Sequence, residues 1–304
     1  MHRIDKEADP ASLFKRRKMN LYSGEYFNRE IREGIFMIGC RYNEKTMDPS
    51  WNAMEDRFEF GTPTGNSWLI IGKNSSLVID SCAPVKGFRK YLEDLAGMKV
   101  DLLLSHAHFD HTFMMSEFDK VYMHKNDRCF FDGRFGFPAY RDLPEDIAYI
   151  DEGDDIELGD RRLKVFHIKG HSDGSVMLLD EKAKVLFSGD SIARRILLFD
   201  IDEDKLSSYF QKIAAMKREP FSCICSAHDR VPLHKEYINF LFDRITKIAD
   251  VTEKRILYKD MPPFYSFKEG DEKTETFINC SVLCEYRDAM VSIVKKTRGY
   301  QDDQ

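Results

Sequence analysis

The chain has 304 residues, 42% of them hydrophobic, and a formal net charge of −6 at pH 7. This length can bury a full core, in one large domain or in a domain with extensions. The charge balance argues against nucleic acid as a partner. No stretch approaches the roughly 20 apolar residues of a membrane span. The first ten residues lack the apolar core of a signal peptide, so we expect a cytoplasmic protein whose seven scattered cysteines are reduced.

The order of polar and apolar stretches predicts alternating strands and helices. Residues 1–28 are polar and basic and predict a solvated arm. Pro84 predicts the start of a helix over about 85–96. Strands are predicted near 35–39, 67–73, 76–80, 100–105, 120–124, 163–168, 175–180, 184–188 and 221–225. Two amphipathic helices are marked by Leu206, Tyr209, Ile213 and Met216, and by Ile238, Leu241, Ile245 and Ile248.

A cluster of histidines follows the apolar run 100–105. It reads His106-Ala107-His108-Phe109-Asp110-His111. Three imidazoles and a carboxylate cannot all face one apolar core, because His and Asp are rarely buried without partners. Alternate residues leaving a strand face one way, so His106 and His108 can meet one metal ion. Asp110 and His111, where the chain turns, can face a second ion.

Three further potential ligands each follow a short apolar run. They are His171 in Gly170-His171-Ser172, Asp190 in Gly189-Asp190-Ser191, and His228 in Ala227-His228-Asp229. This repetition suggests that several strands deliver ligands to one edge of a sheet. Together with the first cluster they supply five imidazoles and two carboxylates, enough for two ions.

These four separated motifs resemble those of a metallo-β-lactamase-fold hydrolase, over about residues 30–250. Residues 151–160 also resemble the hairpin that precedes the family's third ligand motif. The resemblance implies an α/β (α+β) chain folded as a four-layer αββα sandwich over 29–250. The N-terminal arm would cover 1–28. A C-terminal extension, 251–304, would pack on the same domain, and packing or homodimerisation are its candidate roles.

The resemblance also implies a role for each ligand. His106, His108 and His171 would hold the first metal, Asp110, His111 and His228 the second, and Asp190 would bridge both. Imidazole and carboxylate ligands suit zinc best, with iron or manganese as alternatives. Asp110 would have a second, catalytic role in orienting a hydroxide or passing its proton. Asp80 is the candidate for a residue that fixes one of the imidazoles, the alternative being a plain turn residue.

The family is catalytically diverse, and departures from its branches narrow the expectation. True β-lactamases of this fold lack an aspartate at the position of Asp190. Flavodiiron proteins have a glutamate at the position of His108. Only 37 residues (191–227) separate Asp190 from His228, too few for the extra domain of the family's nucleases. With these three branches set aside, the chain resembles the glyoxalase II, lactonase and thioesterase branch.

The resemblance thus implies a binuclear zinc hydrolase in which a bridging hydroxide cleaves an ester, thioester, lactone or related bond of a small molecule. Two alternatives stay open. One is a persulfide dioxygenase with one iron held by two histidines and an aspartate. The other is a noncatalytic metal protein that binds a small molecule. Metal content would discriminate between the first two.

Substrate contacts are the least constrained part of the prediction. Arg194 and Arg195 follow Asp190 and offer planar forks for an anionic substrate, or a surface ion pair with an acid such as Asp200. Residues 129–140 contain five aromatic residues. We expect these rings either to line a substrate pocket or to pack in the core. Trp51 and the segment 58–60 are candidates for a second wall. We expect His124 and His167, at strand ends near the cleft, to be structural.

Overall fold

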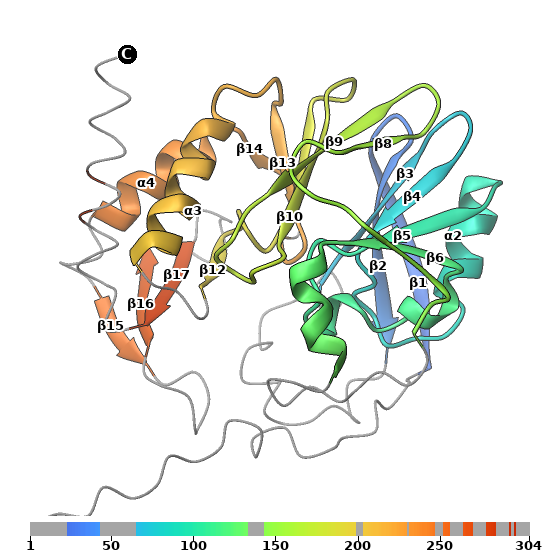
Figure 1. Cartoon of the computed structure of the whole chain (residues 1–304), viewed down its shortest axis with the longest axis horizontal. Helices are drawn as coiled ribbons and strands as arrows, with labels where there is room; N and C mark the ends of the chain where they lie inside the picture. Colours follow the sequence, from blue (N-terminus) through green and yellow to red (C-terminus); the bar gives the residue numbers. More distant parts are fainter. Residues whose placement is uncertain are drawn as a thin grey trace, which may run out of the picture.

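The computed structural model describes residues 23–42, 65–132, 143–198, 203–229, 231–246, 252–255, 264–269, 278–283, 292 and 295. Two mixed β-sheets pack against each other, with helices outside them (Figure 1). This is the four-layer αββα arrangement expected from the sequence. No described helix is long and apolar enough to cross a membrane.

The first sheet contains seven strands in sequence order. They are β1 (Gly24–Arg32), β2 (Ile35–Tyr42), β3 (Ser67–Ile71), β4 (Ser76–Ile79), β5 (Val100–Leu103), β6 (Lys120–Met123) and β7 (Asp146–Tyr149). Pairing is antiparallel from β1 to β4 and parallel from β4 to β7. Helix α2 (Phe88–Ala96) forms the connection between β4 and β5, as a parallel pair requires.

The second sheet has the strand order β14-β13-β11-β10-β9-β8. These strands are β8 (Asp155–Glu157), β9 (Arg162–His167), β10 (Val176–Asp180), β11 (Val185–Gly189), β13 (Cys223–Ser226) and β14 (Leu233–His234). Helix α3 (Glu203–Met216) connects β11 to β13, which run parallel, and α4 (Tyr237–Thr246) follows β14.

Strand alternation divides the core into three apolar layers. On β10, Val176 and Leu178 face the first sheet, and Met177 and Leu179 pack against α3 and α4. On the first sheet, Val78 of β4 packs in the layer that contains α2, whereas its neighbours Leu77 and Ile79 lie between the sheets. Because side chains alternate between the faces of a strand, both sheets are buried on both sides.

Most predicted elements lie where expected, and two boundaries differ. Helix α2 begins at Phe88 rather than near Val85, because Gly87 adopts a left-handed φ of 85°. The Glu117 carboxylate accepts the backbone N–H groups of Gly87 and Arg89 at 2.7 and 3.0 Å, which satisfies donors at this helix start. Residues 24–28, expected in the arm, form part of β1, an edge strand with a largely exposed surface.

A third sheet includes part of the C-terminal extension. Its order is β12-β17-β16-β15, for β12 (Arg195–Leu197), β15 (Thr252–Arg255), β16 (Phe264–Glu269) and β17 (Ile278–Leu283). Strand β12 follows Asp190 closely in the chain and pairs in parallel with β17. The extension is thereby hydrogen-bonded to the segment that leaves the predicted metal site.

Candidate metal centre

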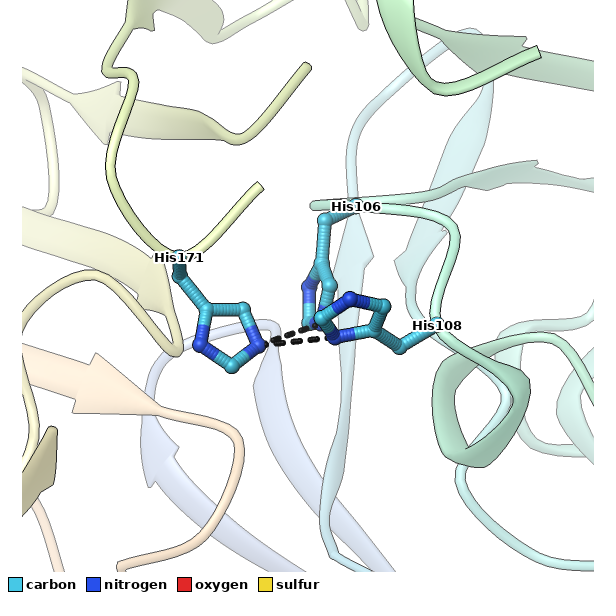
Figure 2. A group of neighbouring side chains, drawn as sticks. All are labelled: His106, His108 and His171. Carbon is cyan, nitrogen blue, oxygen red and sulfur yellow. Dashed lines mark hydrogen bonds between the residues drawn. The ribbon is translucent and has the colours of Figure 1, made fainter. Parts of the chain in front are cut away.

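Three histidines from two loops meet at one point (Figure 2). His106 and His108 lie in the loop after β5, and His171 lies in the loop between β9 and β10. Nε2 of His171 is 3.1 Å from Nε2 of His106 and 2.9 Å from Nδ1 of His108. The three nitrogens form one of the groups able to hold a metal ion.

A second group of donors lies beside the first. Asp110 and His111 lie in a short 3-10 helix (Phe109–His111), and His228 follows β13. Oδ2 of Asp110 is 3.6 Å from Nε2 of His228 and 3.8 Å from Nε2 of His111. These three residues form another group with ligand atoms close enough for one ion.

Asp190 lies between the two groups. Its Oδ1 is 3.6 Å from Nε2 of His111, and its Oδ2 is 3.4 Å from Nε2 of His171 and 3.2 Å from Nε2 of His228. The carboxylate follows β11, the strand next to β13. The structure therefore brings together all seven residues predicted as ligands, with Asp190 in contact with both groups.

Hydrogen bonds behind the histidines fix which nitrogen faces the site. The Ser105 hydroxyl donates to Oδ2 of Asp80 at 2.7 Å, so its oxygen is left to accept Nδ1–H of His106 at 3.1 Å. Nδ1 of His111 donates to the same Asp80 oxygen at 2.9 Å. Both rings consequently point Nε2 into the site, as metal-binding imidazoles with a carboxylate or hydroxyl partner do.

Asp80 has the positioning role that the sequence suggested for it. It is buried after β4 and accepts the backbone N–H of Ser105 through Oδ1 at 2.7 Å. Its φ of +62° is unusual for a non-glycine residue and costs on the order of 1–3 kcal/mol. The contacts with Ser105 and His111 account for this strained conformation.

The electrostatics of the centre favour bound cations. Burial, followed by the neighbouring imidazoles, holds the pKa values of His106 and His108 well below the usual range, so both rings are neutral. Burial alone would also lower the pKa of His111, but Asp80, Asp110 and Asp190 together raise it well above normal. Three carboxylates thus stabilise positive charge at this ring, in the place where an ion would replace a proton.

The donor set passes a direct test of fit to metal ions. Among the described residues, Nε2 of His111 and Oδ1 of Asp190 are buried and make no hydrogen bond. Buried polar atoms without partners are costly, and a cation bound by both would satisfy them. Nitrogens about 2.0–2.1 Å from one zinc ion lie about 2.9–3.4 Å apart. The two separations that His171 Nε2 makes, to His106 at 3.1 Å and to His108 at 2.9 Å, fall in this range.

The predicted substrate contacts are only partly described. Phe130 is half-buried with its ring 5.0 Å from that of His108, whereas Phe131 is buried in the core beside α2. Residues 133–142, Trp51 and the segment 58–60 lie outside the described residues, as does the side chain of Arg195. Nη1 of Arg194 lies 3.6 Å from Oδ1 of Asp229, and Asp200, the ion-pair partner suggested from the sequence, lies outside the described residues.

Two aspartates near the site were not singled out from the sequence. Asp229 is buried and accepts the Ser226 hydroxyl at 2.6 Å, and its own N–H donates to that hydroxyl oxygen, which closes the turn that carries His228. Asp127 is buried in the 3-10 helix Lys125–Asp132, which follows β6. The only sequence signal for either residue is an acid shortly after an apolar strand, which many solvated turns share.

His124 and His167 form a separate pair near the centre. Their rings stack at 4.0 Å with an interplanar angle of 16°, and Nε2 of His124 lies 3.3 Å from Oδ1 of Asp151. These three residues have ligand atoms close enough for an ion. One ion cannot lie in the planes of two stacked, nearly parallel rings, so this arrangement is better suited to packing.

Comparisons with known proteins agree with this fold. The family model described as metallo-beta-lactamase superfamily matches residues 61–252. The acyl-coenzyme A thioesterase MBLAC2 of Homo sapiens is 27% identical over 218 residues, 60% of this chain and 72% of that protein. The hydroxyacylglutathione hydrolase of Francisella philomiragia is 28% identical over 127 residues, 41% of this chain and 46% of that protein. A crystal structure of a beta-lactamase domain protein from Burkholderia ambifaria gives a TM-score of 0.52 at 18% identity, covering 74% of this chain and 78% of the other.

Proposed function

The chain belongs to the metallo-beta-lactamase superfamily, and we propose that it is a binuclear zinc hydrolase that cleaves thioesters of small molecules. The observation that carries this proposal is the position of Asp190. One of its carboxylate oxygens faces His111 and the other faces His171 and His228. A carboxylate placed between two donor groups suits a pair of ions better than a single one.

The ligand assignment follows from the two groups. His106, His108 and His171 would hold one ion, Asp110, His111 and His228 would hold the other, and Asp190 lies between the two groups. When bound, zinc lowers the pKa of water to about 7 and polarises a carbonyl oxygen. Neutral imidazoles and carboxylates are the ligands that zinc commonly takes in such sites.

Asp110 is the acid that we assign to the reaction itself. Its side chain is 19% exposed, so water reaches it. Its Oδ2 lies within 4 Å of both His111 and His228. A carboxylate there can orient an attacking water molecule and accept its proton. Phe130, beside His108, offers an apolar surface for an acyl group.

The thioester assignment is supported by the relatives. One is named an acyl-coenzyme A thioesterase and another a hydroxyacylglutathione hydrolase. Both names describe hydrolases of acyl groups carried on a thiol. The thiol carriers in those substrates are anionic, which fits a small anionic substrate beside two cations.

The direct test is hydrolysis by the zinc-loaded protein of acyl-coenzyme A and acylglutathione thioesters. Matched oxoesters, lactones, phosphodiesters and a cephalosporin serve as comparison substrates. We expect kcat/KM for a thioester to exceed kcat/KM for each comparison substrate by at least about a hundredfold. Contacts with the thiol carrier, both close to the reacting bond and remote from it, can stabilise the transition state for thioester hydrolysis. His171→Ala should abolish this activity. A protein with two zinc ions and no thioester hydrolysis would overturn the proposal, and one iron with oxygen consumption would favour the dioxygenase.

A further inference from the structure

Asp127 makes three hydrogen bonds although it is almost fully buried, at 1% exposure. Its Oδ2 accepts the backbone N–H of Ala107 at 2.9 Å and the hydroxyl of Ser172 at 2.8 Å. Its Oδ1 accepts the backbone N–H of Gly174 at 2.7 Å. Both oxygens are thus used, and each is bonded to a different peptide group.

The partners of Asp127 flank the three histidines that meet in Figure 2. Ala107 lies between His106 and His108, and Ser172 directly follows His171. The carboxylate therefore joins two loops whose histidines are 65 and 63 residues apart in sequence.

Gly174, in the His171 loop, packs closely against Asp127. A Cβ atom on Gly174 would lie 2.5 Å from Oδ1 of Asp127 and 2.8 Å from its backbone nitrogen. Such contacts force the neighbour to move, so only glycine permits this approach. Ser172 is held in turn, because its N–H donates to Oγ of Ser175 at 3.1 Å.

We infer that Asp127 is a positioning residue that holds the His106–His108 loop and the His171 loop at the spacing needed to bind the first metal ion. This inference rests on the proposed function, since it requires a metal at these histidines. Burial raises the pKa of the Asp127 carboxyl, and its three donors oppose that shift. The bonds to Ala107, Ser172 and Gly174 therefore do two things together: they stabilise a buried carboxylate and fix two metal-facing loops.

The test substitutes Asp127→Asn and measures two properties. An amide has one accepting oxygen in place of two, so either Ala107 or Gly174 loses its acceptor. We expect amide hydrogen exchange at one of these residues to become at least about tenfold faster in the metal-free protein, since the opened bond no longer protects it. We also expect the dissociation constant for Co²⁺, followed by its absorption bands, to rise about tenfold to a hundredfold.

Asp180→Asn is the matched control. Asp180 is also buried, but it lies at the other end of β10, where it accepts Ala183 N–H at 2.9 Å and Arg161 Nη1 at 3.2 Å. Asp180→Asn should destabilise the fold but leave the Co²⁺ dissociation constant within about twofold of wild type. The reason is that the partners of Asp180 lie at the end of β10 away from the histidines. Equal weakening of Co²⁺ binding by both variants would overturn the inference.

Two milder variants cover the case in which Asp127→Asn does not fold. Ser172→Ala removes one of the three bonds, and Gly174→Ala displaces the carboxylate. Both should weaken Co²⁺ binding, and normal binding in both would overturn the inference. A wild-type chain that binds no Co²⁺ would overturn the proposed function, and the exchange rates at Ala107 and Gly174 would still decide whether Asp127 joins the loops.

Discussion

The backbone N–H of Arg194 donates to Oδ2 of Asp229 at 3.2 Å, and Nη1 of its guanidinium lies 3.6 Å from Oδ1 of the same carboxylate. Arg194 follows Asp190, and Asp229 follows His228. The pair therefore connects the loops that carry two proposed ligands. Its side chains are 19% and 7% exposed, so it is better shielded than an ordinary surface ion pair.

Arg194→Ala should act through this connection rather than through substrate charge. We expect the free energy of unfolding to fall by about 1–3 kcal/mol, because a buried carboxylate loses its cation. KM for anionic and neutral thioesters should change by the same factor. Arg128→Ala, which removes an exposed pair with Asp132, is the control and should cost no more than about 1 kcal/mol. A selective rise in KM for the anionic substrate would instead place Arg194 at the substrate.

Asp190→Asn should remove the second metal ion and lower turnover at least about a hundredfold. An amide presents one neutral oxygen and one NH₂ group, so it cannot balance the charge of two neighbouring cations. Elemental analysis and kcat measure the two effects. Asp173→Asn, at an exposed aspartate in the His171 loop, is the control. Two tightly bound ions and near-normal activity in Asp190→Asn would contradict the bridging role.

His171→Ala and His228→Ala should each lose metal and activity, whereas His124→Ala and His167→Ala should keep both metals. Nδ1 of His124 accepts the Asn126 N–H at 3.2 Å, which leaves its proton on the nitrogen facing Asp151. Nε2 of His167 bonds the Asp173 carbonyl at 2.9 Å. Metal content by elemental analysis is the measurement. Stoichiometric zinc in His228→Ala, or loss of one ion in His124→Ala, would show that the ligand assignment is wrong.

Removing the metals should lower the stability of the folded chain. Without a cation, His111 Nε2 and Asp190 Oδ1 stay buried without a hydrogen bond among the described residues. A ligand at one hundred times its dissociation constant stabilises the native state by about 2.7 kcal/mol per site. Thermal unfolding before and after chelation, with zinc restored as the control, measures this difference. An unfolding temperature unaffected by chelation would contradict metal binding to the folded state.

The sequence predicted the seven proposed ligands because each follows an apolar strand, and strand ends meet at one edge of a sheet. It also indicated Asp80, whose contact with His111 the structure shows. Asp127 and Asp229 could not be predicted, because Ala107, Ser172 and Gly174, which bond Asp127, and Arg194, which bonds Asp229, lie in other loops, and a buried acid looks like a solvated one in sequence. Strand β1 escaped prediction because it is an exposed edge strand, with no continuous apolar face.

Anomalous X-ray scattering at the zinc absorption edge, from crystals of the full chain grown with zinc, tests the central claim most directly. The account predicts two peaks per chain on either side of Asp190, one against His106, His108 and His171 and one against Asp110, His111 and His228. A single peak, or a peak between His124, Asp151 and His167 with none at Asp190, would contradict it.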